Sequence, residues 1–169
     1  MDFYTSIKIN GFYHFNDPSV FTYLKWFYKI PTVKYENCRY PILHWPVGRI
    51  LIRLTQMAVY KKYLTNYKLT FGNVDAWSGI DIGTDKWHND SIEGSNTAFL
   101  LYSCNTTEET GGGIQFRTLG AGKVHTVYPK KYDIIIMNQD NQFQHKVIPL
   151  KKTINRNTAN VEFNIRGIK

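Results

Sequence analysis

A mainly β fold, a sandwich or barrel preceded by helices, is what the sequence of this 169-residue chain predicts. Aromatic residues make up 15% of the chain, and such residues favour half-buried strands over helices. Many short strand-like runs, separated by turn residues, fill the chain after residue 68, which is typical of sandwiches and barrels. Helical periodicity is confined to the part before them. We therefore expect two helices to pack on one sheet of a single domain.

The first thirty residues are expected to hold one strand and one helix. Residues 4–10 alternate in polarity, which predicts a short strand. Asp17 and Pro18 predict a helix start, because Asp can cap the free amides and Pro fits the first turn. This helix should run to about Tyr28.

A loop and a second helix are expected next. Residues 31–47 carry three Pro and no regular period, which predicts a loop. The second helix should run from about Val47 to Asn66. Its apolar positions recur at helical spacing: Ile50, Leu51, Leu54, Met57, Ala58 and Leu64.

The rest of the chain is predicted to be strands. We divide the 1–169 domain into a helical part of about residues 1–68 and a strand-rich core of about residues 69–169. The strand-like runs are 69–71, 74–77, 97–103, 113–116, 123–128, 133–138, 144–150 and 159–165.

The net charge of +8 admits several partners. A basic protein can attract nucleic acid, anionic membrane or an acidic substrate, or have a basic surface with no special target. No apolar run is long enough for a membrane span, and the N-terminus does not have the pattern of a signal peptide. Two distant Cys without zinc spacing predict a reducing compartment, the cytoplasm, or the host cytoplasm for a viral protein.

A metal site is predicted from two separated segments. In an extended chain residues i and i+2 face the same side, so His88 and Asp90 can bind one ion. His145 follows 57 residues later and completes two His and one carboxylate, the facial triad of non-haem iron(II) oxygenases. Each residue taken alone is more simply a structural one, since such short motifs arise by chance. Their combination favours the metal site.

An anion anchor is predicted eleven residues after the second His. Arg156 and Thr158 share one face of a predicted strand. A guanidinium binds a carboxylate with two parallel hydrogen bonds, and the hydroxyl can add a third. A dicarboxylate cosubstrate needs such an anchor at the end away from the metal. The alternative for Arg156 is a solvated charge at a strand end.

The ordered set WHND, LLYSCNTTEETGGGIQF, VYPKKYDIIIMN, QHKVIPL and RNTANVEF resembles the 2-oxoglutarate/iron(II) oxygenases, in their prolyl-4-hydroxylase-like branch. The resemblance implies a double-stranded β-helix, or jelly roll, and the use of Fe(II), 2-oxoglutarate and O2. It implies that Arg156 binds the far carboxylate of 2-oxoglutarate, with Thr158 and Tyr102 as helpers. Asp90 favours hydroxylation or demethylation, because halogenating relatives lack this carboxylate.

Four functions remain open on the sequence. The first is hydroxylation of a peptidyl, prolyl-type side chain, with release of succinate and CO2. The second is the same chemistry on a small molecule, and the third is the same chemistry on an alkylated nucleic-acid base. The net charge suits a nucleic acid, but Arg156 and Arg166 lack the spacing typical of those demethylases. The fourth is a non-catalytic jelly-roll binding module.

Other polar and aromatic residues are expected to have structural roles. His125 is predicted on a sheet surface, whereas His14 and His44 are expected in packing or loops. Trp77 and Trp87 are expected in the core, with a pocket wall as the alternative. A loop ion site is the alternative for three aspartates without EF-hand spacing, Asp75, Asp81 and Asp85.

Overall fold

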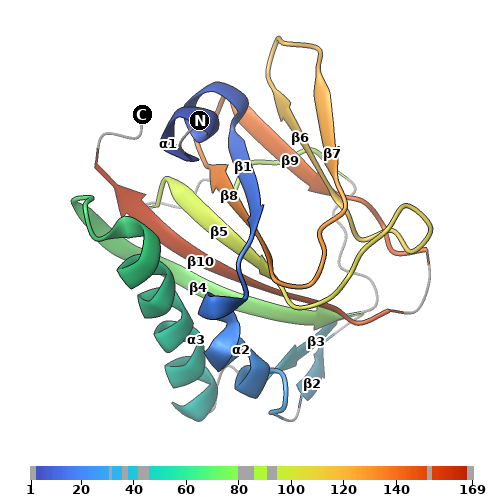
Figure 1. Ribbon diagram of the computed structural model, residues 1–169. Helices are drawn as coiled ribbons and strands as arrows, with labels where there is room; N and C mark the ends of the chain where they lie inside the picture. The colour runs from blue at the N-terminus through green and yellow to red at the C-terminus, as the bar shows by residue number, and fades with distance from the viewer. Residues whose placement is uncertain are drawn as a thin grey trace.

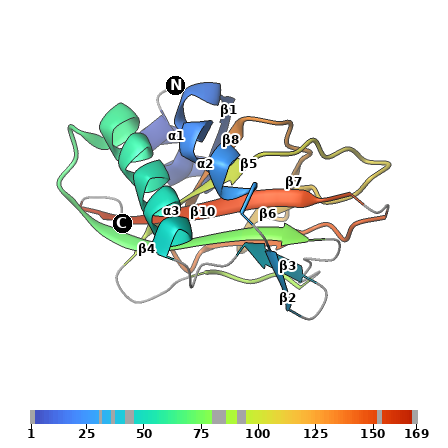
Figure 2. The same ribbon diagram turned by 90° about the horizontal axis from the view of Figure 1, so that it is seen from below.

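The computed structural model describes residues 3–30, 32–35, 38–41, 46–79, 86–90, 95–151 and 154–166. Two antiparallel sheets lie face to face, and helices cover the outer face of the larger one (Figures 1 and 2). This arrangement confirms the predicted mainly β fold with helices on one sheet. The part of the chain described here contains no helix long and apolar enough to cross a membrane.

The larger sheet has seven strands, and three of them come from the N-terminal part of the chain. Their spatial order is β1 (Phe12–Asn16), β8 (Asp133–Asn138), β5 (Thr97–Tyr102), β10 (Arg156–Ile165), β4 (Leu69–Gly79), β3 (Cys38–Pro41) and β2 (Thr32–Tyr35). The smaller sheet has the order β7 (Val124–Val127), β6 (Ile114–Thr118) and β9 (Phe143–Val147).

Two apolar layers hold the fold together. One lies between the helices and the larger sheet and includes Phe99, Val161 and Phe163. The other lies between the two sheets and includes Leu100 and Phe116. Successive residues of a strand point to opposite faces, so adjacent residues of β5 and β10 enter different layers. The helices are α1 (Phe3–Asn10), η1 (Pro18–Phe21), α2 (Thr22–Phe27), α3 (Pro46–Val59) and η2 (Tyr60–Leu64).

Several predicted elements have the expected positions. Asp17 caps the first turn after it, because its Oδ1 accepts a hydrogen bond from the Ser19 amide at 2.9 Å. The strands from β5 to β9 fall within or one to two residues from the predicted runs. The two runs predicted between 69 and 77 form one strand, β4, and the last run begins three residues earlier as β10.

Two predictions for the N-terminal part were wrong. Residues 3–10 form helix α1, not a strand, because Ile7 is buried against the core and Gly11 ends the helix at a positive φ of 79°. The predicted loop of residues 31–47 contains β2 and β3, and β3 pairs with β4. This pairing depends on backbone hydrogen bonds to a distant strand, so no local periodicity announces it.

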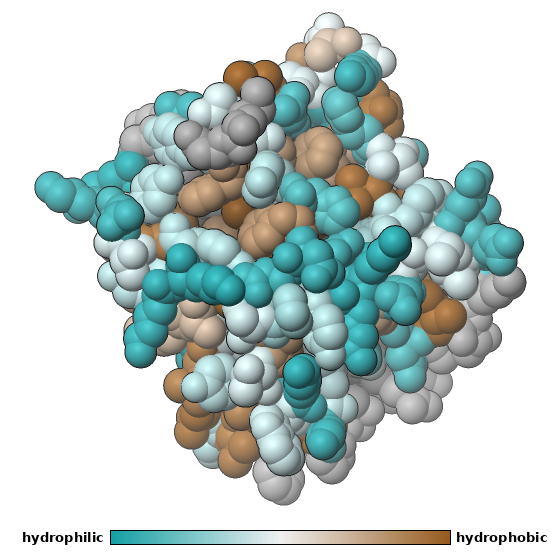
Figure 3. All heavy atoms as spheres, viewed as in Figure 1, coloured by the Kyte–Doolittle hydropathy of each residue, from teal (hydrophilic) through white to brown (hydrophobic). Residues whose placement is uncertain are grey.

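Helix α3 is where predicted, but it turns a different face to the core. Three residues of the predicted apolar face, Ile50, Leu54 and Met57, are exposed. The buried positions include Ile52 and Gln56. Figure 3 accordingly shows a mainly hydrophilic face with hydrophobic patches at the lower left, where α2 and α3 lie.

Gln56 explains this orientation of α3. Its side-chain amide donates hydrogen bonds to the carbonyls of Gly72 and Glu162, at 3.3 and 2.8 Å. The pairing of β4 with β10 is irregular at this point, between Val161 and Phe163. A Cβ at Gly72 would lie 2.9 Å from the Cβ of Glu162, so only glycine allows this approach. The helix is thus joined to the sheet by polar contacts that an apolar periodicity cannot predict.

Candidate active site

The predicted metal-binding residues come together between the two sheets. His88 lies on a short segment that forms an isolated antiparallel bridge with β9. The amides and carbonyls of His88 and His145 exchange two hydrogen bonds, at 3.0 and 2.9 Å. One ligand atom from each of His88, Asp90 and His145 lies within 4.8 Å of the others. No other such group of three occurs among the residues that the structure describes.

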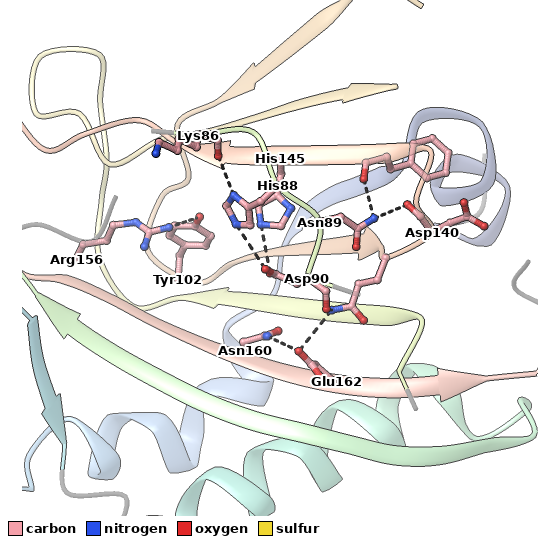
Figure 4. A network of polar contacts seen from close by, with 12 residues as sticks. Lys86, His88, Asn89, Asp90, Tyr102, Asp140, His145, Arg156, Asn160 and Glu162 are labelled. Carbon is pink, nitrogen blue, oxygen red and sulfur yellow. Dashed lines mark hydrogen bonds and ion pairs between the residues drawn. The ribbon is translucent and has the colours of Figure 1, made fainter. Parts of the chain in front are cut away.

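The three side chains are oriented toward one point (Figure 4). Nε2 of His88 lies 3.5 Å from Oδ1 of Asp90, and Nε2 of His145 lies 3.3 Å from Oδ2. Nδ1 of His88 lies 2.9 Å from the carbonyl of Lys86, which can only accept, so Nδ1 carries the proton. His88 therefore presents its Nε2 to Asp90.

Asp90 is suited to hold a cation. Burial raises the pKa of its carboxyl, but the hydrogen bond from His145 and the charges of His145 and His88 outweigh this and hold the pKa below its ordinary value. Asp90 is therefore ionised at neutral pH. Two imidazoles and one carboxylate on one side of an ion are the ligand set of non-haem iron(II) sites, with positions left for other ligands.

The segment of residues 86–90 is fixed on both sides. The Trp87 ring has the Arg117 guanidinium 4.4 Å and the Lys146 ammonium 5.1 Å from its centroid. On its other side, the Asn89 amide donates to the carbonyls of Asp140 and Phe143, at 2.7 and 3.0 Å. These contacts alternate along the segment and leave His88 and Asp90 facing inward.

The predicted anchor forms a second polar group beside the triad (Figure 4). Arg156 is 4% exposed, and it donates from Nε to the Gly112 carbonyl at 3.1 Å and from Nη2 to the Tyr102 hydroxyl at 2.9 Å. Burial raises the pKa of Tyr102, so the phenol keeps its proton and can donate it elsewhere. Thr158 lies opposite Tyr102 in the sheet, and its hydroxyl has no hydrogen-bond partner in the described structure.

No carboxylate pairs with Arg156 within the described part of the chain, where every ion pair involves another cation. A buried guanidinium without a counter-ion is costly unless an anion binds it. The hydroxyls of Tyr102 and Thr158 lie on the same side of the sheet. These three groups suit a carboxylate ligand, and the His-Asp-His group suits a divalent metal.

Three functional candidates, Asn160, Glu162 and Gln139, were missed in the sequence. Asn160 and Glu162 follow Arg156 and Thr158 on the same face of β10, and all four are buried. Gln139 donates from Nε2 to Glu162 Oε1 and to the Asp90 carbonyl, each at 3.4 Å. The alternation of polar residues in RNTANVE was the signal, because polar residues rarely occupy alternate buried positions without a role.

Asp75 was considered only as part of a loop ion site, and the structure places it elsewhere. It lies on β4 directly opposite Asn160, so it faces the space between the sheets and does not form a loop site. Burial raises the pKa of Asp75, and the charge of Asp90 raises it further. Asp81 and Asp85, with which it was grouped, lie outside the described residues, as does His44.

The remaining histidines and tryptophans have structural contacts. His125 is half-buried on β7 and packs edge-on against Phe12, as expected for a sheet residue. His14 lies on β1, where its Nε2 contacts Asp133 Oδ2 at 2.7 Å. Trp77 and Trp87 are half-buried, whereas core positions were expected.

No protein-family model matches the chain, and no curated protein sequence does. Solved structures do match. An oxidoreductase of the 2OG-Fe(II) oxygenase family from Burkholderia pseudomallei has a TM-score of 0.73 at 10% identity, over 96% of this chain and 88% of that one.

Two further structures match over similar lengths. A prolyl hydroxylase from Trichoplax adhaerens, in complex with a hypoxia inducible factor peptide fragment, has a TM-score of 0.67 at 15% identity, over 96% of this chain and 87% of that chain. HygX from Streptomyces hygroscopicus, with nickel and 2-oxoglutarate bound, has a TM-score of 0.60 at 14% identity, over 96% and 86%. The chain therefore has the jelly-roll fold of the 2-oxoglutarate/iron(II) oxygenases, prolyl hydroxylases included.

Proposed function

We propose that this protein is an iron(II)- and 2-oxoglutarate-dependent dioxygenase that hydroxylates an unactivated C–H bond. The observation that carries the proposal is the convergence of His88, Asp90 and His145 beside a buried Arg156 without a carboxylate partner in the described structure. A fold shared with many functions does not by itself give an activity. This activity is favoured because the His-Asp-His group and the Arg156 anchor lie together in one interior.

Each site has a distinct part in the proposed reaction. His88, Asp90 and His145 would hold Fe(II), and Arg156 with Tyr102 and Thr158 would hold the far carboxylate of 2-oxoglutarate. When bound, iron and 2-oxoglutarate would activate O2, with one oxygen atom going to the substrate carbon and the other to succinate as CO2 is released.

The chain's own residues position these groups. Lys86 fixes the His88 tautomer through its carbonyl, and Asn89 fixes the segment between the two ligands. The buried guanidinium of Arg156 sets where the cosubstrate lies. A Cβ at Gly112 would meet the side chain of Leu150 at 2.7 Å, so this glycine allows the packing around Arg156.

A peptidyl, prolyl-type side chain is our proposed substrate. One structural neighbour is a prolyl hydroxylase with a peptide fragment bound, which supports this class. HygX, another neighbour, has been solved with hygromycin B bound, which supports a small molecule as the second candidate. We further propose that residues 1–169 act as one domain in a reducing compartment, since β1 pairs with β8 and Cys104 is a free thiol.

Metal and cosubstrate binding test this proposal. The purified protein is titrated anaerobically with Fe(II) and 2-oxoglutarate while the visible charge-transfer band is recorded, and succinate is then measured after oxygen is added. The wild type should show the band and form succinate, and His145→Ala should lose both. His125→Ala is the matched control, since His125 lies on the same small sheet outside the triad.

The possible results separate the hypotheses. Wild-type behaviour in the His145→Ala variant would mean that the triad is not the metal site. Neither a band nor succinate in the wild type would favour a non-catalytic jelly-roll module instead.

A further inference from the structure

A row of oxygen acceptors lines the space beneath the triad. Asn160 and Glu162 project from β10 toward Asp90 (Figure 4). Glu162 is 1% exposed and accepts hydrogen bonds from Ser95 at 3.0 Å, from Asn160 at 2.8 Å and from Gln139 at 3.4 Å. The Glu162 carboxylate therefore has three hydrogen-bond donors. Two of the side chains that donate to it, Asn160 and Gln139, have amide oxygens that accept no hydrogen bond in the described structure.

Two buried amide oxygens around Glu162 have no donor. Oδ1 of Asn160 and Oε1 of Gln139 are without a hydrogen-bond partner in the described structure, and both residues are 4% exposed. An amide oxygen buried without a donor costs about 1–3 kcal/mol. Such groups in a folded protein call for an explanation, and a bound donor is the simplest one.

Asp75 adds a charge to these unpaired oxygens. It lies directly opposite Asn160 in the β4–β10 pair, where side chains of neighbouring strands lie about 4.5–5.5 Å apart. The half-buried Asp75 carboxylate makes no hydrogen bond or ion pair within the described ranges. Asp75 and Oδ1 of Asn160 therefore face the same space, and neither has a donor among the described residues.

The negative charges here contrast with the rest of the molecule. The chain carries 21 Lys and Arg against 13 Asp and Glu, yet Asp75, Asp90 and Glu162 all face this interior. The described Lys and Arg side chains make no ion pair with any of the three. A ligand with a positive charge and N–H donors would both balance the carboxylate charges and donate hydrogen bonds to the unpaired oxygens.

We infer that Asp75 and Asn160 form a subsite for a cationic nitrogen of the substrate, an ammonium or guanidinium group. A metal ion fits less well, because the triad is the only group of three His, Cys, Asp or Glu ligands found among the described residues. Directional N–H donors match single amide oxygens instead. The inference rests on the proposed function, since the subsite adjoins the triad and would orient the substrate over it.

The net charge of the protein further restricts the class of ligand that the subsite can bind. A protein of net charge +8 repels a strongly cationic molecule at long range. A ligand with one cationic group on an otherwise neutral or acidic body avoids this repulsion. The subsite therefore favours a single amine or guanidine near the reacting carbon over a polycation.

Matched small probes test the subsite without knowledge of the substrate. Butylammonium and butylguanidinium are compared with the neutral butanol and butylurea, without metal and again with Mn(II) and 2-oxoglutarate. Binding is followed by the indole N–H signal of Trp77, which lies two residues from Asp75 on the same strand face, and this signal is assigned with Trp77→Phe. Wild-type protein should bind the cations at least tenfold more tightly than the neutral probes.

The variants decide whether Asp75 is responsible. Asp75→Asn, which keeps the shape of the side chain, should lose the preference for cations, whereas Glu108→Gln removes an exposed charge and should keep it. Equal binding of charged and neutral probes by the wild type would overturn the subsite, as would an unchanged preference in Asp75→Asn. Failure of Mn(II) and 2-oxoglutarate to bind would count against the proposed function alone, because the probes are also measured without them.

Discussion

The two faces of β10 are both buried, but they differ in chemistry. From Ala159 onward the strand presents only apolar side chains toward the helices: Ala159, Val161, Phe163 and Ile165. Toward the small sheet it presents only polar ones: Arg156, Thr158, Asn160 and Glu162. Burying a large apolar side chain stabilises a protein by about 1.5–3 kcal/mol, whereas a buried polar group without a partner destabilises it. One face therefore holds the fold together, and the other makes sense only with ligands present.

The largest expected effect lies on the helix-facing side. Phe163 is fully buried, and its ring centroid lies 5.6 Å from that of Phe99 and 5.7 Å from that of Phe71. Phe163→Ala should lower the free energy of unfolding by about 3–5 kcal/mol, measured by urea denaturation. Metal affinity of the folded fraction should not change. A large loss of metal affinity in protein that is still folded would mean that the two faces are coupled.

The inward face should respond in the opposite way. Arg156→Ala should weaken 2-oxoglutarate binding by about 1.5–3 kcal/mol for each charge-assisted hydrogen bond lost, or roughly 10- to 150-fold. Calorimetric titration of the Mn(II)-loaded protein measures this. Arg156→Lys keeps the charge but loses the planar fork, so it should restore binding only in part. Arg166→Ala, at an exposed position just after the same strand, is the control for net charge, and equal effects in both variants would contradict the anchor.

A smaller change separates stability from binding at a single position. The buried Thr158 hydroxyl has no hydrogen-bond partner in the described structure. Thr158→Val should therefore leave the stability of the ligand-free protein unchanged or raise it by up to about 1 kcal/mol. The same variant should weaken 2-oxoglutarate binding by about 0.5–1.5 kcal/mol. Loss of stability without loss of affinity would show that Thr158 is part of the core.

The contrast between the faces also explains what could be predicted from the sequence. Apolar periodicity located most strands of the jelly roll, because each strand buries at least one regular face. The spacing of His88, Asp90 and His145 indicated a metal site, and the fold brings these residues together, although their role stays a prediction. Local sequence patterns are sufficient to predict a feature when the residues that form it lie within one segment or at a regular spacing.

The failures involve contacts between distant segments. Residues 3–10 have strand-like alternation, but packing of Ile7 against the core overrides it. Gln56 turns α3 toward the irregular β4–β10 pairing through backbone carbonyls 16 and 106 residues away. Asp75 was grouped with loop aspartates because its opposition to Asn160 exists only in the folded sheet. None of these pairings has a local signature.

The smallest expected effect is a pH dependence on the inward face. Burial raises the pKa of Glu162, and the charge of Asp75 raises it further, against three hydrogen bonds that lower it. The folded protein then holds this proton more tightly than the unfolded chain. The contribution of Glu162 to stability therefore falls as pH rises from the ordinary glutamate pKa of about 4.3 through the raised folded value. Glu162→Gln does not ionise, and its oxygen can still accept from the same amides.

The free energy of unfolding of Glu162→Gln, relative to wild type, should thus increase with pH across this interval. Urea denaturation at several pH values measures it, and the exposed Glu108→Gln should give a curve parallel to wild type. Parallel curves for both variants would mean that Glu162 ionises on the inward face without penalty. In that case the polar face would be less costly to the fold than its burial implies.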